Sequence, residues 1–319
     1  MNIELIVLDT ENNKKYDLSE IVLNLSWTTT LEGTAGQLQF TLAPSEYEFH
    51  MGSVVWLKIP GKADIFRGYI FTASYGKERQ LNVTAYDQTR YLKNADTYIF
   101  KNVRADEIFE KICKDFQLKY EVAAKVNYIC SPVPHDNVPI SEMIQRAIDE
   151  TFVKTGEYLF VHDEFGTLKL DNLLNYHRNY VFDKDLINYD FSYSQSIDGK
   201  VANRIKLIRN TKSGRQVSMI QDSGTVGKWG VLQHYEKITK EGTQKELDDR
   251  AEKLLQLMNK PVEKLTFTVE GKLDVFAGCQ MYISLADVSK EKTNKVCIIT
   301  SAKHTFNNNL HLMELTVRL

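Results

Sequence analysis

The chain has 319 residues, a formal net charge of -2 at pH 7, and globular proportions of hydrophobic (43%) and charged (26%) residues. This length suits about two domains of the usual ~150 residues, and three small domains would also fit. The small net charge gives no long-range field to attract a polyanion, and no apolar run reaches the ~18 residues that span a bilayer. Composition therefore excludes a disordered chain and gives no support to nucleic-acid binding or membrane insertion.

The first ninety residues follow the pattern of short strands. Turn residues such as Pro60 and Gly61 separate segments in which apolar and polar side chains alternate. Glu4 stands where a secretion signal would carry a base, so we expect synthesis in the cytoplasm. Six strands without an intervening helix predict an antiparallel barrel or sandwich. The predicted strands cover residues 3–8, 21–27, 37–43, 53–59, 64–73 and 80–86.

The pattern changes after Tyr86. Asp87 is placed to cap a short turn over residues 88–91, and its spacing to Arg90 favours a structural corner over a ligand site. Two helices are then predicted by apolar residues at helical spacing, over residues 106–116 and from the candidate N-cap Ser141 to residue 152.

Three prolines between these helices, Pro132, Pro134 and Pro139, predict a loop. After the second helix, residues 158–162 and 167–170 are expected to pair as a hairpin around an acidic turn that ends in glycine. The pattern of this part of the chain therefore predicts a small α+β domain.

Strands return after Val201. A hairpin is predicted from residues 202–209 and 215–221, followed by a flexible loop over residues 224–230 that contains Trp229 and Gly230. This loop is the nearest candidate for a phosphate-binding loop, but the helix that should follow it is missing. Further strands are predicted over residues 231–235, 262–270, 279–285, 295–305 and 311–319.

The most fully specified unit is a helix over residues 243–258. Thr243 and Glu246 form a capping box, and Pro261 prevents the helix from continuing. Apolar residues form one stripe about 100° wide, so one face should be buried. The stripe consists of Leu247, Ala251, Leu254, Leu255 and Met258.

These elements predict an α+β, mainly β protein of three domains. The division is a first β-barrel domain at residues 1–91, an α+β insertion domain at 92–191, and a second β-barrel domain at 192–319 that is flanked by the helix just described.

No catalytic, cofactor or metal site is expected. The seven histidines lack metal-ligand spacing, no nucleophile elbow or phosphate loop is present, and the four cysteines are expected to be small buried hydrophobes. His162 and Asp163 could act as an acid-base pair, but they lie at a predicted hairpin turn, where Asp is favoured for backbone reasons. Asp163 and Glu164 remain open as a hydrolase pair, and exposed aromatic residues leave open a carbohydrate-binding module.

The run V-T-A-Y-D-Q-T-R-Y-L-K-N at residues 83–94 strongly resembles the tail hub proteins of PBSX-type prophages and R-type tailocins, members of the late-control-D superfamily. The resemblance spans nearly the whole chain, because further matching motifs follow in the same order. These lie at residues 96–98, 155–158, 163–168, 201–205, 229–233 and 259–261.

The resemblance implies a structural role without enzymatic activity. Such hubs are homotrimers in which each subunit contributes two barrels resembling the tail-tube protein, so that a ring of six barrels joins a sixfold inner tube to a threefold central spike. The implied partners are the tube or its initiator, the spike, the tape measure and other baseplate subunits, including a LysM-type protein. The implied setting is the baseplate of a contractile phage tail or a phage-tail-like bacteriocin, a contractile injection system. For the interfaces we expect contributions from Tyr86, Asp87, Arg90, Tyr91, Trp229 and Gly230.

Overall fold

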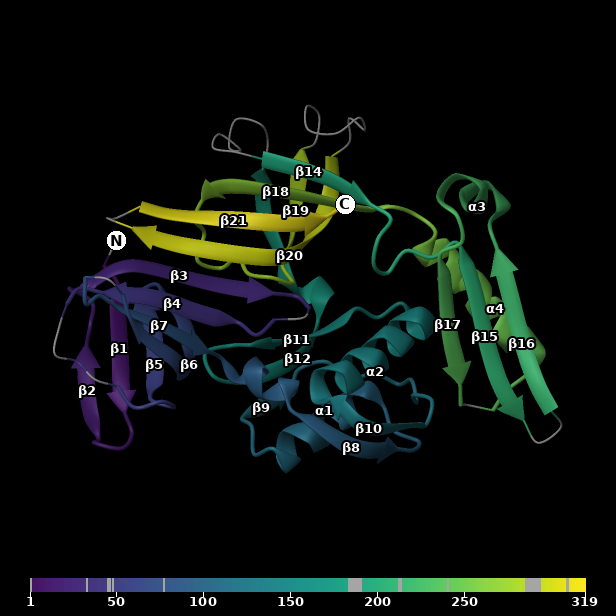
Figure 1. Ribbon diagram of the computed structural model, residues 1–319, viewed down its shortest axis with the longest axis horizontal. Coiled ribbons are helices and arrows are strands. Elements are labelled where there is room, and N and C mark those ends of the chain that lie inside the picture. The colour runs from purple at the N-terminus through teal and green to yellow at the C-terminus, as the bar shows by residue number, and fades with distance from the viewer. Residues whose placement is uncertain are drawn as a thin grey trace.

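The computed structural model describes residues 2–32, 34–44, 47, 49–76, 78–182, 191–211, 214–239, 241–284, 294–307 and 310–319. Its architecture is mainly β with few helices (Figure 1), which confirms the predicted fold class. All four cysteines are buried, as expected.

The amino-terminal strands form one half of a large sheet around an apolar core. Leu38, Phe40 and Leu42 alternate with more exposed residues along one strand, as the sequence pattern predicts, and pack with Leu5 and Leu57. The strands are β1 (Glu4–Asp9), β2 (Lys14–Asp17), β3 (Val22–Thr30), β4 (Gln37–Leu42), β5 (Val54–Ile59), β6 (Ala63–Tyr75) and β7 (Leu81–Tyr86).

The carboxyl-terminal strands form the other half of the same sheet around a second core, in which Leu265, Phe267 and Val269 are buried as predicted. These strands are β13 (His177–Phe182), β14 (Phe191–Ser196), β18 (Val262–Glu270), β19 (Gln280–Ser284), β20 (Asn294–Asn307) and β21 (Leu310–Arg318). The last residue of the strand predicted at 279–285 lies outside the described residues.

The two halves join where β20 pairs with β3 (Figure 1). The resulting order is β14-β18-β21-β20-β3-β4-β7-β6-β5-β1-β2, with β19 beside β20 and β13 beside β19. The first and last strands of this order do not pair with each other, so the described strands close no barrel. The two tube-like barrels stay predictions, as do the domain boundaries after residues 91 and 191.

A buried aromatic stack lies at the centre of the joint. Trp27 of β3 stacks on His304 of β20 with ring centroids 4.9 Å apart, and the two residues are register partners. The Nε2 atom of His304 lies 2.8 Å from the carbonyl oxygen of Val275 and must donate to it, so His304 Nδ1 accepts from His311 Nε2 at 2.9 Å. Burial lowers the pKa of His304 to about 3 and that of His311 to about 4, so both rings are neutral at pH 7.

The middle of the chain packs two helices on small sheets over a third core. Its helices confirm the two predicted there. The elements are η1 (Gln88–Lys93), β8 (Ala95–Phe100), α1 (Ala105–Asp115), β9 (Tyr120–Val122), β10 (Val133–Pro139), α2 (Ile140–Thr155), β11 (Leu159–Asp163), β12 (Leu168–Asn172) and η2 (Leu173–Tyr176).

Two expectations for this region are wrong. The proline-containing segment is the strand β10 rather than a loop. In its two-stranded sheet, β10 pairs with β8 on one side only. Proline is tolerated in such an edge strand because the backbone N–H that it lacks is not needed for pairing on the other side. Ser141 is not the N-cap of α2, which begins at Ile140 with Pro139 in the cap position and without a side-chain cap. The backbone N–H groups at the start of a helix have no partner within the helix, so a proline there, which lacks the N–H, costs no hydrogen bond.

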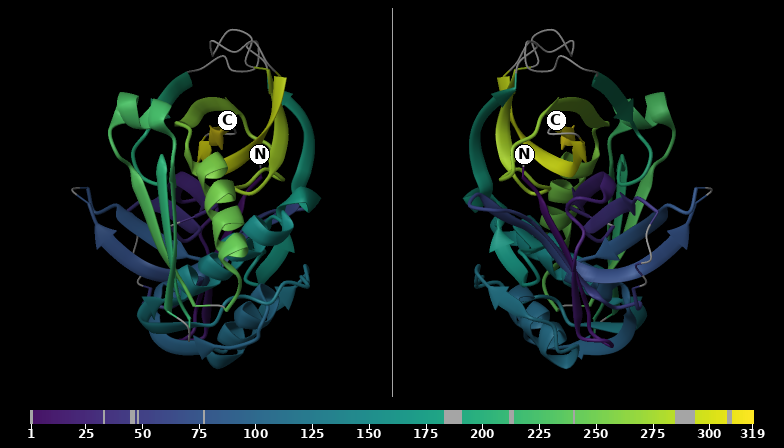
Figure 2. Two further views of the ribbon diagram at one scale, coloured as in Figure 1. Left: turned by 90° about the vertical axis from the view of Figure 1, so that its right-hand side faces the viewer. Right: turned by 90° about the vertical axis from the view of Figure 1, so that its left-hand side faces the viewer.

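A fourth core lies under a three-stranded sheet at one end of the molecule (Figure 1), facing the reader in the left view of Figure 2. The sheet contains β15 (Arg204–Thr211), β16 (Gly214–Gln221) and β17 (Gln233–Ile238), and α4 (Gln244–Met258) packs on one face. Thr243 caps α4 through the predicted capping box, and Leu247, Ala251 and Leu254 are buried.

The loop expected over residues 224–230 is wrong for most of its length. Residues Ser223–Trp229 form the short helix α3, in which Asp222 Oδ1 accepts from the backbone N–H of Thr225 at 2.8 Å. Gly230 ends the helix with a φ of 73°. The glycines inside the segment suggested a loop, but the cap at Asp222 and the terminal Gly230 offset their weak helix propensity.

The histidine pair predicts acid sensitivity. Since both folded pKa values lie below the ordinary 6.5, the histidines contribute stability above pH 6.5 that is lost as the pH falls towards 4. We expect the free energy of unfolding to fall by about 1 to 2 kcal/mol per histidine between pH 7 and pH 5. Chemical denaturation across this pH range measures the slope.

His311→Gln keeps a hydrogen-bond donor that cannot be protonated, so its stability should depend less steeply on pH than that of the parent chain. The matched control is His177→Gln on the exposed β13 residue, which should keep the parental slope. Equal slopes for the parent and His311→Gln would contradict the assignment of a neutral pair.

Candidate functional site

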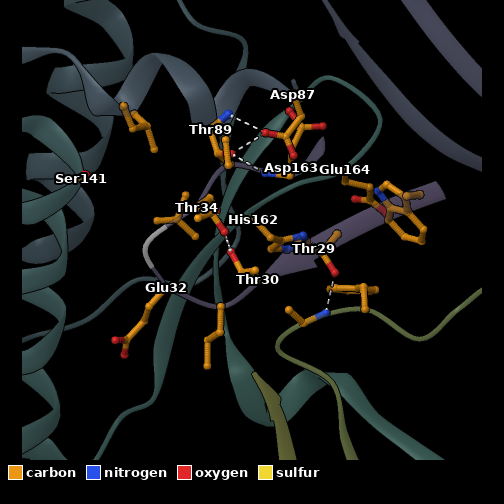
Figure 3. A pocket seen from close by; sticks show the side chains of 18 of the residues that line it. Thr29, Thr30, Glu32, Thr34, Asp87, Thr89, Ser141, His162, Asp163 and Glu164 are labelled. Carbon is orange, nitrogen blue, oxygen red and sulfur yellow. Dashed lines mark hydrogen bonds between the residues drawn. The ribbon is translucent and has the colours of Figure 1, made fainter. Parts of the chain in front are cut away.

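A cavity of about 770 Å³ lies where the three predicted parts of the chain meet. Its lining includes Thr29 from β3, Asp87 beside η1 and Asp163 from β11 (Figure 3). Phe276, from the segment between β18 and β19, also lines it. The backbone N–H of Ala277 donates to Thr29 Oγ1 at 2.9 Å, which ties the last of these segments to the first. Because this cavity is concave and several polar groups converge on it, we treat it as the candidate site.

Asp87 fixes the corner between β7 and η1. Its carboxylate accepts from the Thr89 backbone N–H at 2.9 Å and from the Thr89 hydroxyl, while its own N–H donates to the Gly36 carbonyl oxygen at 3.0 Å. A Cβ atom at residue 36 would lie 2.0 Å from Asp87 Oδ2. A side chain at position 36 would therefore displace the Asp87 carboxylate from this corner. The capping role predicted for Asp87 is confirmed.

Gln88 connects this corner to the β11–β12 hairpin. Its Nε2 donates to the Gly166 carbonyl oxygen at 2.5 Å, and its Oε1 accepts from the Lys119 backbone N–H at 3.2 Å. In the hairpin turn, Asp163 Oδ1 accepts from the Gly166 N–H at 2.6 Å. Gln88 is only 6% exposed, so the first β region and the α+β region are joined by buried hydrogen bonds.

This junction places two carboxyl groups against each other. Figure 3 shows Asp163 next to Asp87, and Asp163 Oδ2 is buried without a hydrogen-bond partner. Burial raises the pKa of Asp163 to about 6. The pKa of Asp87 is raised well above its ordinary value, mainly by burial and to a smaller extent by repulsion from Asp163. The pair therefore retains a proton at a pH where an exposed Asp is ionised.

His162 is held as a neutral structural group. Its ring stacks on Phe160 and Phe276 with centroid distances of 4.8 and 5.5 Å. The Tyr176 hydroxyl donates to Asp171 Oδ2 at 2.9 Å and lies 3.1 Å from His162 Nε2, from which it accepts. Burial lowers the pKa of His162 to about 4. The ring therefore faces Tyr176 rather than its sequence neighbour Asp163 and is not arranged as a general base.

The two acids left open as a hydrolase pair have separate partners. The exposed Glu164 forms an ion pair with Lys169 at the edge of the cavity, whereas Asp163 turns towards Asp87. A facing carboxyl pair does exist, but it joins Asp163 to a residue 76 positions earlier in the chain.

The structure brings four of the six expected interface residues together. Tyr91 packs against Tyr69 at 5.8 Å, Tyr86 against Phe71 at 5.4 Å, and the Arg90 guanidinium lies 5.3 Å from the Phe71 ring centroid. Asp87 lies beside them but is buried.

The other two residues lie at the end of α3, at one end of the molecule (Figure 1). There the Gly230 carbonyl oxygen accepts from Asn203 Nδ2 at 2.7 Å. The interface role of all six residues stays a prediction.

Other kinds of site receive no support from the described residues. No three His, Cys, Asp or Glu side chains in them are grouped so as to hold a metal ion. None of the helices described combines the length and apolar character needed to cross a membrane.

Comparison with known proteins gives consistent matches. The YQBQ-like family model matches residues 25–318. The chain is 32% identical to the uncharacterized protein YqbQ of Bacillus subtilis (strain 168), covering 86% of this chain and 83% of YqbQ. It is 30% identical to the phage-like element PBSX protein XkdQ of the same strain, covering 85% of this chain and 82% of XkdQ.

The fold is similar to that of the 43 kDa tail protein of prophage MuSo2 from Shewanella oneidensis, with a TM-score of 0.70 and 15% identity over 98% of each chain.

The carboxyl pair predicts a stability that falls as the pH rises. Because the folded pKa of Asp163 lies above the ordinary 3.8, the stabilising protonated form is complete at low pH and is lost as the pH passes through about 6. Asp163→Asn removes the repulsion and retains the acceptor for Gly166. We expect it to raise the free energy of unfolding at pH 8 by about 1 to 2 kcal/mol and to change it little at pH 4.

Urea denaturation at both pH values measures this difference. The matched control is Glu164→Gln, the neighbouring exposed acid, which should change stability by less than about 0.5 kcal/mol at either pH. A larger loss of stability in Asp163→Asn at pH 8 than at pH 4 would exclude the repulsive pair.

Proposed function

This chain belongs to the YQBQ-like family, and on that basis we propose that it is a structural component of a phage-type tail, the hub of the baseplate. Its relative XkdQ is named as a protein of a phage-like element. The MuSo2 protein, which has a similar fold, is a prophage tail protein. The observation that carries the proposal is the open sheet that runs through both terminal regions. Such a sheet leaves edges for subunits to cover.

The edge strand β14 supports assembly through this sheet. It carries the sequence F-S-Y-S-Q-S, without a charge or a proline, and among the described strands it pairs with β18 alone. Natural proteins blunt free edges with lysine, proline or short strands. The opposite edge strand, β2, has only four residues, of which two are lysines. β14 is therefore the edge that another chain would complete.

We infer a closed ring of three copies. A contact between β14 of one copy and a different surface of the next copy is heterologous, and repeated contacts of that kind must close into a ring or grow into a filament. With two tube-like β regions in each chain, three copies supply six such regions, as the resemblance to tail hubs implies. The proposed ring joins the sixfold inner tube to the threefold spike in the baseplate of an assembled particle.

A cell-wall hydrolase is the competing function. The Asp87 and Asp163 pair lines a cavity and holds a proton, which is the observation in its favour. However, the corner that holds Asp87 also joins two regions of the chain, so a structural reason for the pair is already present. Peptidoglycan-release assays distinguish the two, because turnover that is lost in Asp163→Asn would support the hydrolase.

The ring predicts an oligomer that depends on the β14 edge. The purified chain, alone or with its spike protein, should give a light-scattering mass for this chain of about 110 kDa, three times the 36.8 kDa of one copy. Ser192→Lys with Ser194→Lys adds two charges at exposed positions of β14 and should shift the mass towards that of one copy, because charges disfavour edge pairing.

The matched control places the same two lysines at Thr72 and Ser74, which are exposed on β6, a strand that already pairs with β7. This variant should keep the mass of the parent chain. A stable single copy in the parent, with and without the spike protein, would rule out the trimeric hub.

A further inference from the structure

Among the described elements, α4 packs on one face of the three-stranded sheet of β15, β16 and β17, and no helix or strand packs on the other. Ile205 and Leu207 of β15 pack against Leu247 and Ala251 of α4. Side chains alternate between the two faces of a strand, so Lys206 and Ile208 lie on the other face. Figure 1 shows the sheet at the edge of the molecule with α4 behind it. We call the face opposite α4 the open face.

Apolar side chains gather at the centre of the open face. Met219 and Tyr235 are the register partners of Lys206 on its two sides, and Val217 is the partner of Ile208 in the next row. Met219 is 60% exposed, Tyr235 55% and Val217 44%. Exposed aromatic and methionine side chains that adjoin one another are typical of protein interfaces.

The charge of the open face is of one sign. Lys206, Lys237, Arg204 and Arg215 belong to it by alternation and register, and none of them has a carboxylate partner among the residues described. The single acidic residue in the three strands, Glu236, lies on the α4 face, where its Oε1 is 3.0 Å from Arg250 Nη2. The open face thus has four cations and no anion, in a chain whose net charge is -2.

We propose that the open face docks an acidic segment of another protein of the same particle, a segment that places apolar side chains against Met219, Tyr235 and Val217. Burying these apolar groups would supply binding free energy, and carboxylates around them would pair with the lysines and arginines and select the partner. This inference rests on the proposed function, because it assigns the partner to the particle.

The arrangement favours a protein over nucleic acid or lipid. A nucleic-acid surface places cations along the track of a phosphate backbone, and its aromatic groups form stacking platforms. Here Tyr235 is the one aromatic side chain of the face, and the cations surround Val217 and Met219, which give a phosphate nothing to bind. A flat sheet also lacks the apolar helix face that inserts into a bilayer surface.

Photo-crosslinking in the bacterium that carries the gene tests the proposal. A benzophenone amino acid replaces Met219 in the full-length chain, the particles are purified after irradiation, and the crosslinked peptide is sequenced by mass spectrometry. We expect a peptide from another particle protein that has net negative charge and apolar residues. Lys206→Glu with Lys237→Glu should reduce the yield of that adduct at least fivefold.

The matched control is Lys245→Glu with Lys253→Glu, the same charge change on the exposed face of α4, which should leave the yield unchanged. Circular dichroism and thermal melting verify that both variants fold. An adduct with nucleic acid, with lipid or with a second copy of this chain would overturn the inference, and so would the absence of an adduct in particles that contain the chain. Absence of the chain from the particles would overturn the proposed function as well.

Discussion

The pairing of β3 with β20 is the contact on which the rest of the structure depends. The first residues of the two strands lie 272 positions apart in the sequence, and without their pairing each terminal region would have one more unsatisfied strand edge. The sequence places Trp27 and His304 opposite each other at this joint, where their stacked rings are removed from water. A neutral histidine suits this position because each of its ring nitrogens can serve a neighbour, Val275 on one side and His311 on the other.

A second constraint follows from the first. The α+β region lies between the two β regions in the sequence. Once these form one sheet, the α+β region must contact both of them, and it does so at the cavity. The hydrogen bonds of Gln88 and the corner at Asp87 hold it to the amino-terminal strands, while the contact of His162 with Phe276 holds it to the carboxyl-terminal part. The facing carboxyl groups are then a cost of this close packing, because Asp87 caps η1 and Asp163 shapes the hairpin turn, and both tasks belong to Asp.

Local signals explain how far the sequence could predict this structure. The helix at α4 follows from a capping box and a proline stop within twenty residues, and the alternation in β4 and β18 identifies their buried faces. The errors arise where local rules compete: glycines suggested a loop at α3, and prolines suggested one at β10. The meeting of Asp87 with Asp163, and the bridge made by Gln88, depend on a pairing of distant segments and leave no periodic pattern. Only the cap at Asp87 had a readable signal.

The cavity and the surface differ in how their charged groups are arranged. In the cavity, burial keeps His162 neutral, and the carboxyl groups of Asp87 and Asp163 retain a proton. On the surface, by contrast, β14 lacks the charges that protect an edge, and the open face of β15, β16 and β17 keeps four cations unpaired by carboxylates in the described residues. Complementary surfaces of other chains would stabilise both the unprotected edge and the face of one charge, which is why we propose that these two surfaces take part in assembly. The buried polar groups, in contrast, hold the regions of the chain to one another.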